Sequence, residues 1–216
     1  MNKILVDGEK FLLDNVNTAE ITVDGINNIL YINNNSESLD LKILMKPFSS
    51  LTIFDFNLCD KKQSVEVVQD NNSKFEYYHS FKTEGQYDLN YKAIINGDNN
   101  ENNIFVRGVS LDNNYINVDG VINEHSKGNV LNEDLRMLNL GGNAYVSPML
   151  HVSALDVIAN HNTAISNIRE DELFYLKSKG ISEENCIKLI SDGYLYGLFK
   201  NDEYFFNLIT NNNGGE

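Results

Sequence analysis

The first 125 residues read as a series of short β-strands, and no convincing amphipathic helix interrupts them. In most of these stretches apolar and polar residues alternate, as at Leu39, Leu41 and Ile43, which is typical of strands with one buried face. Chains with many short strands and regular turn signals fold into a sandwich, a barrel or a β-solenoid. The predicted strands are Lys3–Val6, Lys10–Leu13, Glu20–Val23, Ile29–Ile32, Leu39–Met45, Ser50–Phe56, Ser64–Gln69, Phe75–Phe81, Tyr87–Ile95, Ile104–Val109 and Tyr115–Val121.

Turn-forming pairs separate the predicted strands. These pairs favour tight turns because Gly, Asn and Asp tolerate left-handed backbone. They also fit antiparallel hairpins, and no fixed-length repeat distinguishes a solenoid from the other two folds. The clearest pairs are Asp7-Gly8, Asp24-Gly25, Asn96-Gly97 and Asp119-Gly120. Shorter strands are predicted to follow at Leu135–Leu140, Tyr145–Leu150 and Ala154–Ala159.

Charge and composition limit the classes of function. The 216 residues carry 31 acidic and 17 basic side chains, a net charge of −14, and 42% of them are hydrophobic. Such a chain is long enough for one substantial core and too apolar to be disordered. Binding to nucleic acid or to a membrane is disfavoured because phosphate backbones and anionic lipids attract basic surfaces. The N-terminus shows no apolar signal-peptide region and no apolar run is long enough to span a membrane, so a cytoplasmic protein is expected.

Few residues carry the chemistry of a catalytic or metal centre. Cys59 and Cys186 lie far apart, and neither has a Cys or His at metal-ligand spacing, which excludes a local zinc site. A long-range disulfide stays open, although Cys186 fits better as a small core residue and Cys59 is assigned no role. The sequence contains neither a phosphate-binding loop nor the nucleophile elbow of hydrolases. Paired carboxylates of the kind that β-helix glycosidases use also stay open.

Residues 166–196 predict two helices joined by a tight turn. Asn167 and Glu170 have the spacing of a capping box, and acidic residues in the first turn suit the positive end of the helix dipole. Gly180 is placed to end this helix in a left-handed conformation, and Ser182 to cap the next one.

The second helix is expected to end near Gly193. A third, short helix is predicted at residues 200–210, with Asp202 or Asn201 as its cap. The tail at residues 211–216 reads NNNGGE, a composition that predicts disorder.

The amino-acid sequence of this region resembles that of a known family. Residues 156–168 read DVIANHNTAISNI, and the helical segments DELFYLKSKGI and SEENCIKLISDGYL follow. This order is similar to the C-terminal signature of the SufB/SufD family of iron–sulfur cluster assembly proteins, in which a strand ends in a His and a helix close to ELFYLRSRGI follows. The match is specific over roughly residues 130–195, and upstream of it the sequence is β-rich without family-specific motifs.

The resemblance implies a fold and its domains. We expect a right-handed parallel β-helix over residues 1–165, a C-terminal helical hairpin at 166–210 and a disordered tail at 211–216. Asparagine stacked at the corners of the coils would fit such a solenoid, and Asn pairs are frequent in this sequence. The N-terminal helical region of typical family members is not recognisable in this chain.

The resemblance also indicates two residues at a cluster or subunit interface. His161 matches a family His at the contact between two β-helix subunits, where an imidazole is a suitable iron ligand, so it is the candidate metal ligand. Taken alone, it reads as a surface histidine at a strand end. The cluster-accepting subunit has a Cys near the position of Glu133, which taken alone reads as a solvated acid in a loop. Because a thiolate is the usual cluster ligand, the chain resembles the SufD side of the family, or a reduced paralogue.

In the family, the C-terminal hairpin docks an ABC-type ATPase, SufC. Without the resemblance, the hairpin reads as a cap over the open end of a solenoid. The resemblance implies that docking uses apolar side chains that surround the first helix and reach the following turn: Leu173, Phe174, Tyr175, Leu176 and Ile181.

The sequence thus predicts a non-catalytic scaffold subunit for iron–sulfur cluster assembly. It would pair with a SufB-type subunit or with itself, bind a SufC-like ATPase, hold no cofactor tightly, and carry an iron–sulfur cluster only transiently in the complex. The alternative is an acidic β-solenoid that binds carbohydrate or protein and has no role in cluster assembly. Abundant Tyr and Asn favour this alternative, and the missing signal peptide disfavours it.

Overall fold

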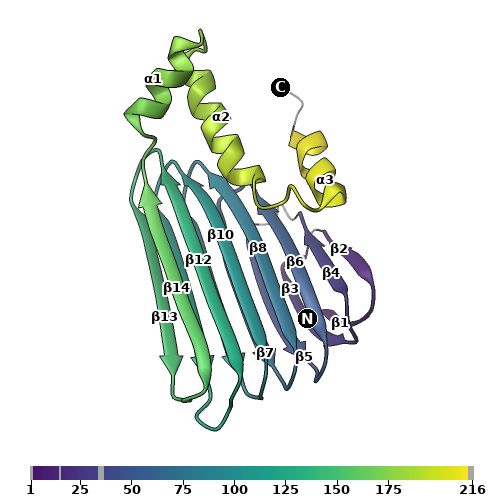
Figure 1. Cartoon of the computed structure of the whole chain (residues 1–216). Helices are drawn as coiled ribbons and strands as arrows, with labels where there is room; N and C mark the ends of the chain where they lie inside the picture. Colours follow the sequence, from purple (N-terminus) through teal and green to yellow (C-terminus); the bar gives the residue numbers. More distant parts are fainter. Residues whose placement is uncertain (1, 15, 34–36, 214–216) are drawn as a thin grey trace.

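The computed structural model describes residues 2–14, 16–33 and 37–213, which form two parallel β-sheets and three helices (Figure 1). Sheet A contains, in order, β1 (Asn2–Asp7), β3 (Thr18–Asp24), β5 (Ser38–Met45), β7 (Lys61–Gln69), β9 (Tyr87–Ile95), β11 (Asn114–Ile122) and β13 (Ala144–Val152). Sheet B contains β14 (Val157–Ser166), β12 (Asn129–Asn139), β10 (Glu101–Ser110), β8 (Lys74–Thr83), β6 (Ser50–Asn57), β4 (Asn28–Ile32) and β2 (Lys10–Leu13). The helices are α1 (Glu170–Ser178), α2 (Glu183–Tyr196) and α3 (Glu203–Asn213).

Successive strands enter the two sheets alternately, so each coil of the chain gives one strand to each sheet (Figure 1). Every strand pairing among the described residues is parallel, as in the ladders β1–β3 and β2–β4. Turns such as Asp24-Gly25 therefore link the two sheets and do not close hairpins. The predicted mainly β solenoid with C-terminal helices is confirmed, and the sandwich and the barrel are excluded.

The coils lengthen along the chain, which explains why the sequence shows no fixed repeat. Asn2 pairs with Ala19, 17 residues further on, whereas Asn114 pairs with Ala144, 30 residues further on. The strands after residue 126 are predicted to be short, but β12, β13 and β14 have 11, 9 and 10 residues and are among the longest. The prediction is wrong because strand length here follows the ladder with the preceding coil and not local turn signals.

Alternating side chains point into the solenoid and form its core. Leu39, Leu41 and Ile43 of β5 are at most 1% exposed, which confirms the period-two pattern. Burying a side chain of this size contributes about 1.5–3 kcal/mol. Among the described residues, no helix is long and apolar enough to cross a membrane.

Asparagine stacks at the corners of the coils, as the solenoid prediction expects. The side chain of Asn28 accepts a hydrogen bond from the N–H of Gly8 at 2.7 Å and donates one to the carbonyl of Ser50 at 3.0 Å, so it joins three consecutive coils. Four coils further on, the amide of Asn129 donates to the carbonyl of Gly97 at 3.0 Å. These bonds satisfy backbone groups that tight turns leave unpaired.

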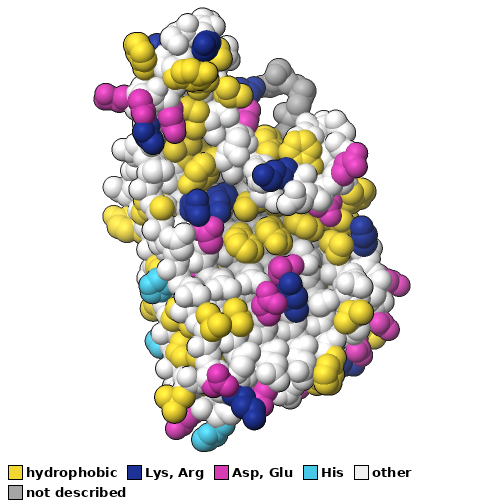
Figure 2. Space-filling model, viewed as in Figure 1, with side chains coloured by type: hydrophobic (Ala, Val, Ile, Leu, Met, Phe, Trp, Pro, Cys, Tyr) yellow, Lys and Arg dark blue, Asp and Glu magenta, His cyan; other side chains and the backbone are white. Residues whose placement is uncertain are grey.

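Helices α2 and α3 pack on the outer face of sheet B, where Figure 2 shows hydrophobic side chains gathered beneath them. This face presents a row of aromatic rings on consecutive strands, with neighbouring centroids 5.0–5.8 Å apart. Phe199 and Phe205 pack on the row and are fully buried. The hydroxyl of Tyr31 also donates a hydrogen bond to Asp202 at 3.0 Å. The row consists of Tyr31, Phe54, Tyr78 and Phe105.

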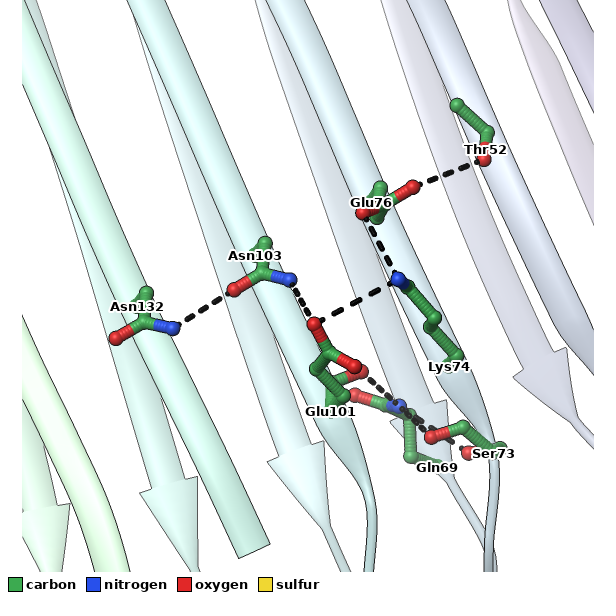
Figure 3. A network of polar contacts seen from close by, with 8 residues as sticks. All are labelled: Thr52, Gln69, Ser73, Lys74, Glu76, Glu101, Asn103 and Asn132. Atoms are coloured by element: carbon green, nitrogen blue, oxygen red, sulfur yellow. Dashed lines mark hydrogen bonds and ion pairs between the residues drawn. The ribbon is translucent and has the colours of Figure 1, made fainter.

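A row of polar side chains crosses the same sheet beyond the helices (Figure 3). Asn132 donates to Asn103 at 2.8 Å and accepts from Asn160 at 3.0 Å, so the row reaches the last strand, β14. Hydrogen bonds and ion pairs thus satisfy this uncovered part of the sheet. Its other members are Thr52, Lys74, Glu76 and Glu101.

Candidate functional site

Glu133 and His161 lie side by side at the C-terminal end of the solenoid. They are direct Cα partners in the parallel ladder between β12 and β14, so both point to the same side of sheet B. Neighbouring strands lie about 4.8 Å apart, which brings the two side chains together although 27 residues separate them in the chain. The structure therefore unites the two residues that the sequence assigns to a cluster or subunit interface.

Glu133 is buried, and its prediction as a solvated acid in a loop is wrong. It lies inside β12 and is 2% exposed, because the strand's alternation directs it into the solenoid. Within the described part of the chain, neither carboxylate oxygen has a hydrogen-bond partner. Burial, and to a lesser degree the nearby charge of Asp119, raise the pKa of Glu133 to about 8. Burial thus favours the protonated form of this carboxyl group near neutral pH.

Gly120 completes the surroundings of Glu133, and the sequence reading missed it. The pair Asp119-Gly120 is predicted both as a turn signal and as part of the strand Tyr115–Val121; β11 runs through it, so the strand is confirmed and the turn is wrong, and Gly120 faces the interior. A Cβ atom there would lie 2.3 Å from Leu131 and 3.1 Å from Glu133 Oε1. Only glycine leaves this space free. The sequence offers one signal for this close approach: a glycine at an inward-facing position of an alternating strand.

His161 is exposed and lies in the middle of β14, which continues to Ser166. The prediction that the strand ends at this histidine is wrong, because the ladder with β12 holds five further residues. Among the described residues, no three His, Cys, Asp or Glu side chains lie close enough together to hold a metal ion. Glu133 and His161 are therefore not part of a three-residue metal-binding group within the described part of the chain.

Helix α1 begins later than the sequence suggests. Its N-cap is Arg169, whose side chain makes no capping hydrogen bond, so the capping box of Asn167 and Glu170 is wrong. Arg169 instead bonds Asp171 through Nε at 3.0 Å. The cause is the extended β14, which keeps the chain out of helical geometry for longer. The acidic first turn of α1 is confirmed.

Several other boundaries of the helical region are as predicted, but α3 runs from Glu203 to Asn213, three residues into the segment predicted as a disordered tail, and residues 214–216 lie outside the described part of the chain. Gly180 ends α1 with a φ of +84°, and the hydroxyl of Ser182 accepts from the N–H of Asn185 at 3.4 Å. Asp202 caps α3 by accepting from the N–H of Phe205 at 2.8 Å. Gly193 does not end α2, which continues to Tyr196. The buried side chain of Leu195 holds this last turn against sheet B.

The proposed docking residues surround a helix that the solenoid leaves free. Helix α1 has no buried residue, and Figure 1 places it beyond the ends of the strands. Phe174 and Tyr175 are 76% and 61% exposed, whereas Leu173, Leu176 and Ile181 are half-buried.

A hollow of about 520 Å³ lies beside these residues. Leu173 and Phe174 line its apolar part, and Glu170, Lys177, Ser178 and Glu183 complete it.

Neither cysteine is among the candidate site residues. Both are free thiols, so the open alternative of a disulfide is excluded. Cys186 is fully buried in α2, with Sγ 3.7 Å from the carbonyl of Ile181, which confirms its prediction as a small core residue. Cys59 is partly exposed near the turn between β6 and β7.

These features define a class of protein: a parallel β-solenoid with an open last coil and a helical hairpin whose first helix stands clear of the strands while its second packs on sheet B. A family model described as the SufBD core domain of the SUF system for FeS cluster assembly matches residues 50–194. This span covers about two thirds of the chain and includes Glu133, His161 and α1. The chain belongs to the SufBD family.

Curated relatives carry the same description. The SufBD family protein ycf24 of Galdieria sulphuraria is 30% identical over 139 residues, which cover 62% of this chain and 63% of the relative. A relative in Synechocystis is 28% identical over 134 residues, covering 59% and 28%. One in Methanothermobacter thermautotrophicus is 26% identical over 176 residues, covering 76% and 37%. The aligned part thus spans less than two thirds of each relative, and all three are described as iron–sulfur cluster assembly proteins.

Proposed function

We propose that this chain is a non-catalytic subunit of an iron–sulfur cluster assembly scaffold. The observation that carries the proposal is the family match over residues 50–194, because that span contains the open last coil, α1 and most of α2. In this role iron and sulfide are substrates of the assembled complex. The chain contributes binding surfaces to that complex, in the cytoplasm, as the sequence predicts.

The open end of the solenoid is the surface that we assign to pairing with a SufB-type subunit or a second copy. In the described structure β13 and β14 are edge strands, and each leaves a row of unpaired backbone donors and acceptors. Apolar side chains accompany this edge, with Tyr145, Met149, Ile158 and Ile165 between 42% and 58% exposed. A long open edge with apolar neighbours associates readily with another chain, which favours a partner here.

His161 is exposed at this pairing surface, and Glu133 lies beside it, buried in the neighbouring strand. A carboxylate and an imidazole are both suitable ligands for iron. The usual cluster ligand, a thiolate, is missing from the pair, so a partner has to supply it. This chain therefore holds iron or a nascent cluster at the shared interface and does not build a cluster alone.

We assign docking of a SufC-like ATPase to α1 and the turn after it. Exposed aromatic side chains next to a hollow are the usual anchors of protein interfaces, and Phe174 and Tyr175 have this arrangement. Nucleotide hydrolysis would take place in the ATPase, and α2 would carry its motion to sheet B, on which it packs.

The test is a binding measurement between this chain and a purified SufC-like ATPase. Phe174→Asp should weaken binding at least about 100-fold, because it places a charge where the ATPase would bury an apolar side chain. Leu189→Asp is the matched control, since Leu189 is 54% exposed on α2 outside the proposed surface, and it should bind like wild type. Equal affinity of wild type and Phe174→Asp, with both folded by circular dichroism, would refute the docking proposal.

A further inference from the structure

A group of polar side chains is buried inside the middle coils, apart from Glu133 and His161. Each member is at most 3% exposed, and the surrounding interior is apolar and aromatic. Burying polar groups is costly unless hydrogen bonds satisfy them, so the positions of their protons can be worked out. The members are Asp55 on β6, Lys61 and Gln63 on β7, Tyr77 and His79 on β8, and Tyr87 on β9.

Gln63 sets the direction of the hydrogen bonds. One end of its amide faces both Oδ2 of Asp55 and the hydroxyl of Tyr77, the latter at 2.6 Å. Tyr77 donates its own proton to Asp55 Oδ2 at 2.6 Å, so both groups need a donor from Gln63. That end is therefore the NH₂ group, and the oxygen Oε1 faces Tyr87.

The orientation of Gln63 determines the proton on one nitrogen of His79. Tyr87 donates its single hydroxyl proton to Gln63 Oε1 at 3.2 Å. Its oxygen also lies 2.7 Å from Nε2 of His79 and has only acceptor capacity left. Nε2 of His79 therefore carries a proton.

Asp55 determines the proton on the other nitrogen. Nδ1 of His79 lies 3.1 Å from Asp55 Oδ2, which already accepts from Tyr77 and Gln63 and so carries no proton. A proton on Oδ1 would lack an acceptor, because Oδ1 has no hydrogen-bond partner among the described residues. Asp55 is thus a carboxylate, and a bare Nδ1 lone pair beside it would be repelled. Nδ1 carries a proton as well, in an ion pair whose N–H bond is not aligned with Oδ2.

We propose that His79 is a buried imidazolium paired with the Asp55 carboxylate, and that this pair locks the middle coils together. Other groups facing the pair fit this assignment. Lys61 acts on Asp55 and favours its ionised form, while Tyr77 and Tyr87 stay neutral because burial raises the pKa of each hydroxyl. On β10, the partner of His79 in the ladder is the uncharged Val106.

The ionisation of Asp55 agrees with this assignment. Burial by itself opposes the charged carboxylate, but the neighbouring His79, Lys61 and the Tyr77 hydroxyl together lower the pKa of Asp55 below its usual value.

Nitrogen-15 NMR of histidine-labelled protein at pH 7.5 tests the proposal directly. We expect one of the four imidazoles to carry protons on both ring nitrogens, with the exposed His125, His151 and His161 as internal references. Four neutral imidazoles would overturn the proposal, and this wild-type spectrum needs no variant.

A pair of variants assigns the imidazolium to this site. Asp55→Asn should remove the doubly protonated signal, because it removes the paired charge. Asp119→Asn is the matched control, since Asp119 lies 3.4 Å from Nε2 of His151, and it should leave the signal unchanged. A signal that survives Asp55→Asn in a folded protein would overturn the pairing. The proposed function in cluster assembly stands or falls separately.

Discussion

The two ends of the solenoid differ in the length of their edge strands and in the groups buried beside them. At the N-terminal end β1 and β2 have only six and four residues, and very short edge strands are one way in which proteins prevent edge-to-edge association. At the C-terminal end β13 and β14 have nine and ten residues, and Glu133 is buried there without a hydrogen-bond partner among the described residues. Apolar side chains are exposed at both ends, as Leu12 and Ile158 illustrate. The difference therefore lies in edge length and in a buried carboxyl group without a hydrogen-bond partner among the described residues, which supports the proposal that a partner covers the C-terminal end.

The largest effect is expected from filling the space at Gly120. Gly120→Val should lower the free energy of unfolding by about 3 kcal/mol, because the interior beside Leu131 and Glu133 has no room for a side chain. Urea unfolding measures this loss. The control Asn117→Val changes an exposed position of the same strand and should stay within about 0.5 kcal/mol. A loss below about 1 kcal/mol would mean that the C-terminal end of the solenoid is loosely packed and opens locally.

Glu133→Gln should stabilise the isolated chain at high pH. The pKa of about 8 in the folded state exceeds the ordinary value of 4.5, so the native carboxyl keeps a proton that the unfolded chain releases. Wild-type stability from this group is present below pH 4.5 and is lost as the pH rises through 8. The variant, which has no charge to bury, should gain about 2 kcal/mol at pH 9 and little at pH 5.

Urea unfolding at both pH values checks this gain. Glu66→Gln, at a partly exposed carboxylate paired with Lys42, should show no such dependence on pH. If Glu133→Gln and Glu66→Gln respond alike, the C-terminal end carries no special electrostatic strain.

Two matched substitutions to Asp, one at each edge of sheet B, test the pairing surface. Ile158→Asp on β14 should weaken association at least about tenfold, or about 1.4 kcal/mol, while Leu12→Asp on β2 should have no effect. Sedimentation velocity of the chain, alone and with a SufB-type subunit, measures both. Equal effects of the two variants would remove the distinction between the ends. A wild-type chain that stays monomeric on its own would reject self-pairing and leave only the SufB-type partner.

The smallest effect is expected in the narrow half of the solenoid, at Phe48. Its φ is +63°, and Asn72 and Asn99 occupy the corresponding turns of the next two coils with φ near +57°. A bulky side chain is strained in this left-handed conformation, and Phe48 is 68% exposed and so gains little from packing.

Phe48→Asn should therefore raise the free energy of unfolding by roughly 0.5–1 kcal/mol in a thermal or urea titration. The converse change, Asn72→Phe, should lower it by a similar amount. Stabilisation by both changes, or by neither, would show that backbone strain does not govern these turns.

Much of the local structure follows from the sequence alone. Alternating apolar residues predict the strands, since each strand buries one face whatever its neighbours are. Gly180, Ser182 and Asp202 predict helix boundaries because their effects depend on backbone geometry within a few residues. The family signature between residues 130 and 195 also lies in one continuous stretch and can be recognised without a structure.

Contacts between residues that lie far apart in the chain depend on the tertiary structure. The coils differ in length, so no repeat in the chain indicates the register that pairs Glu133 with His161 or that turns Gly120 toward Glu133. The contact of Tyr31 with Asp202 joins residues 171 positions apart. Each of these contacts depends on the register of the whole solenoid, because a ladder is fixed by long-range hydrogen bonds and shared burial. Local patterns in the chain therefore predict most strands and helix boundaries, and the family resemblance names the candidate residues, whereas the register of the folded coils fixes how those residues are buried and paired.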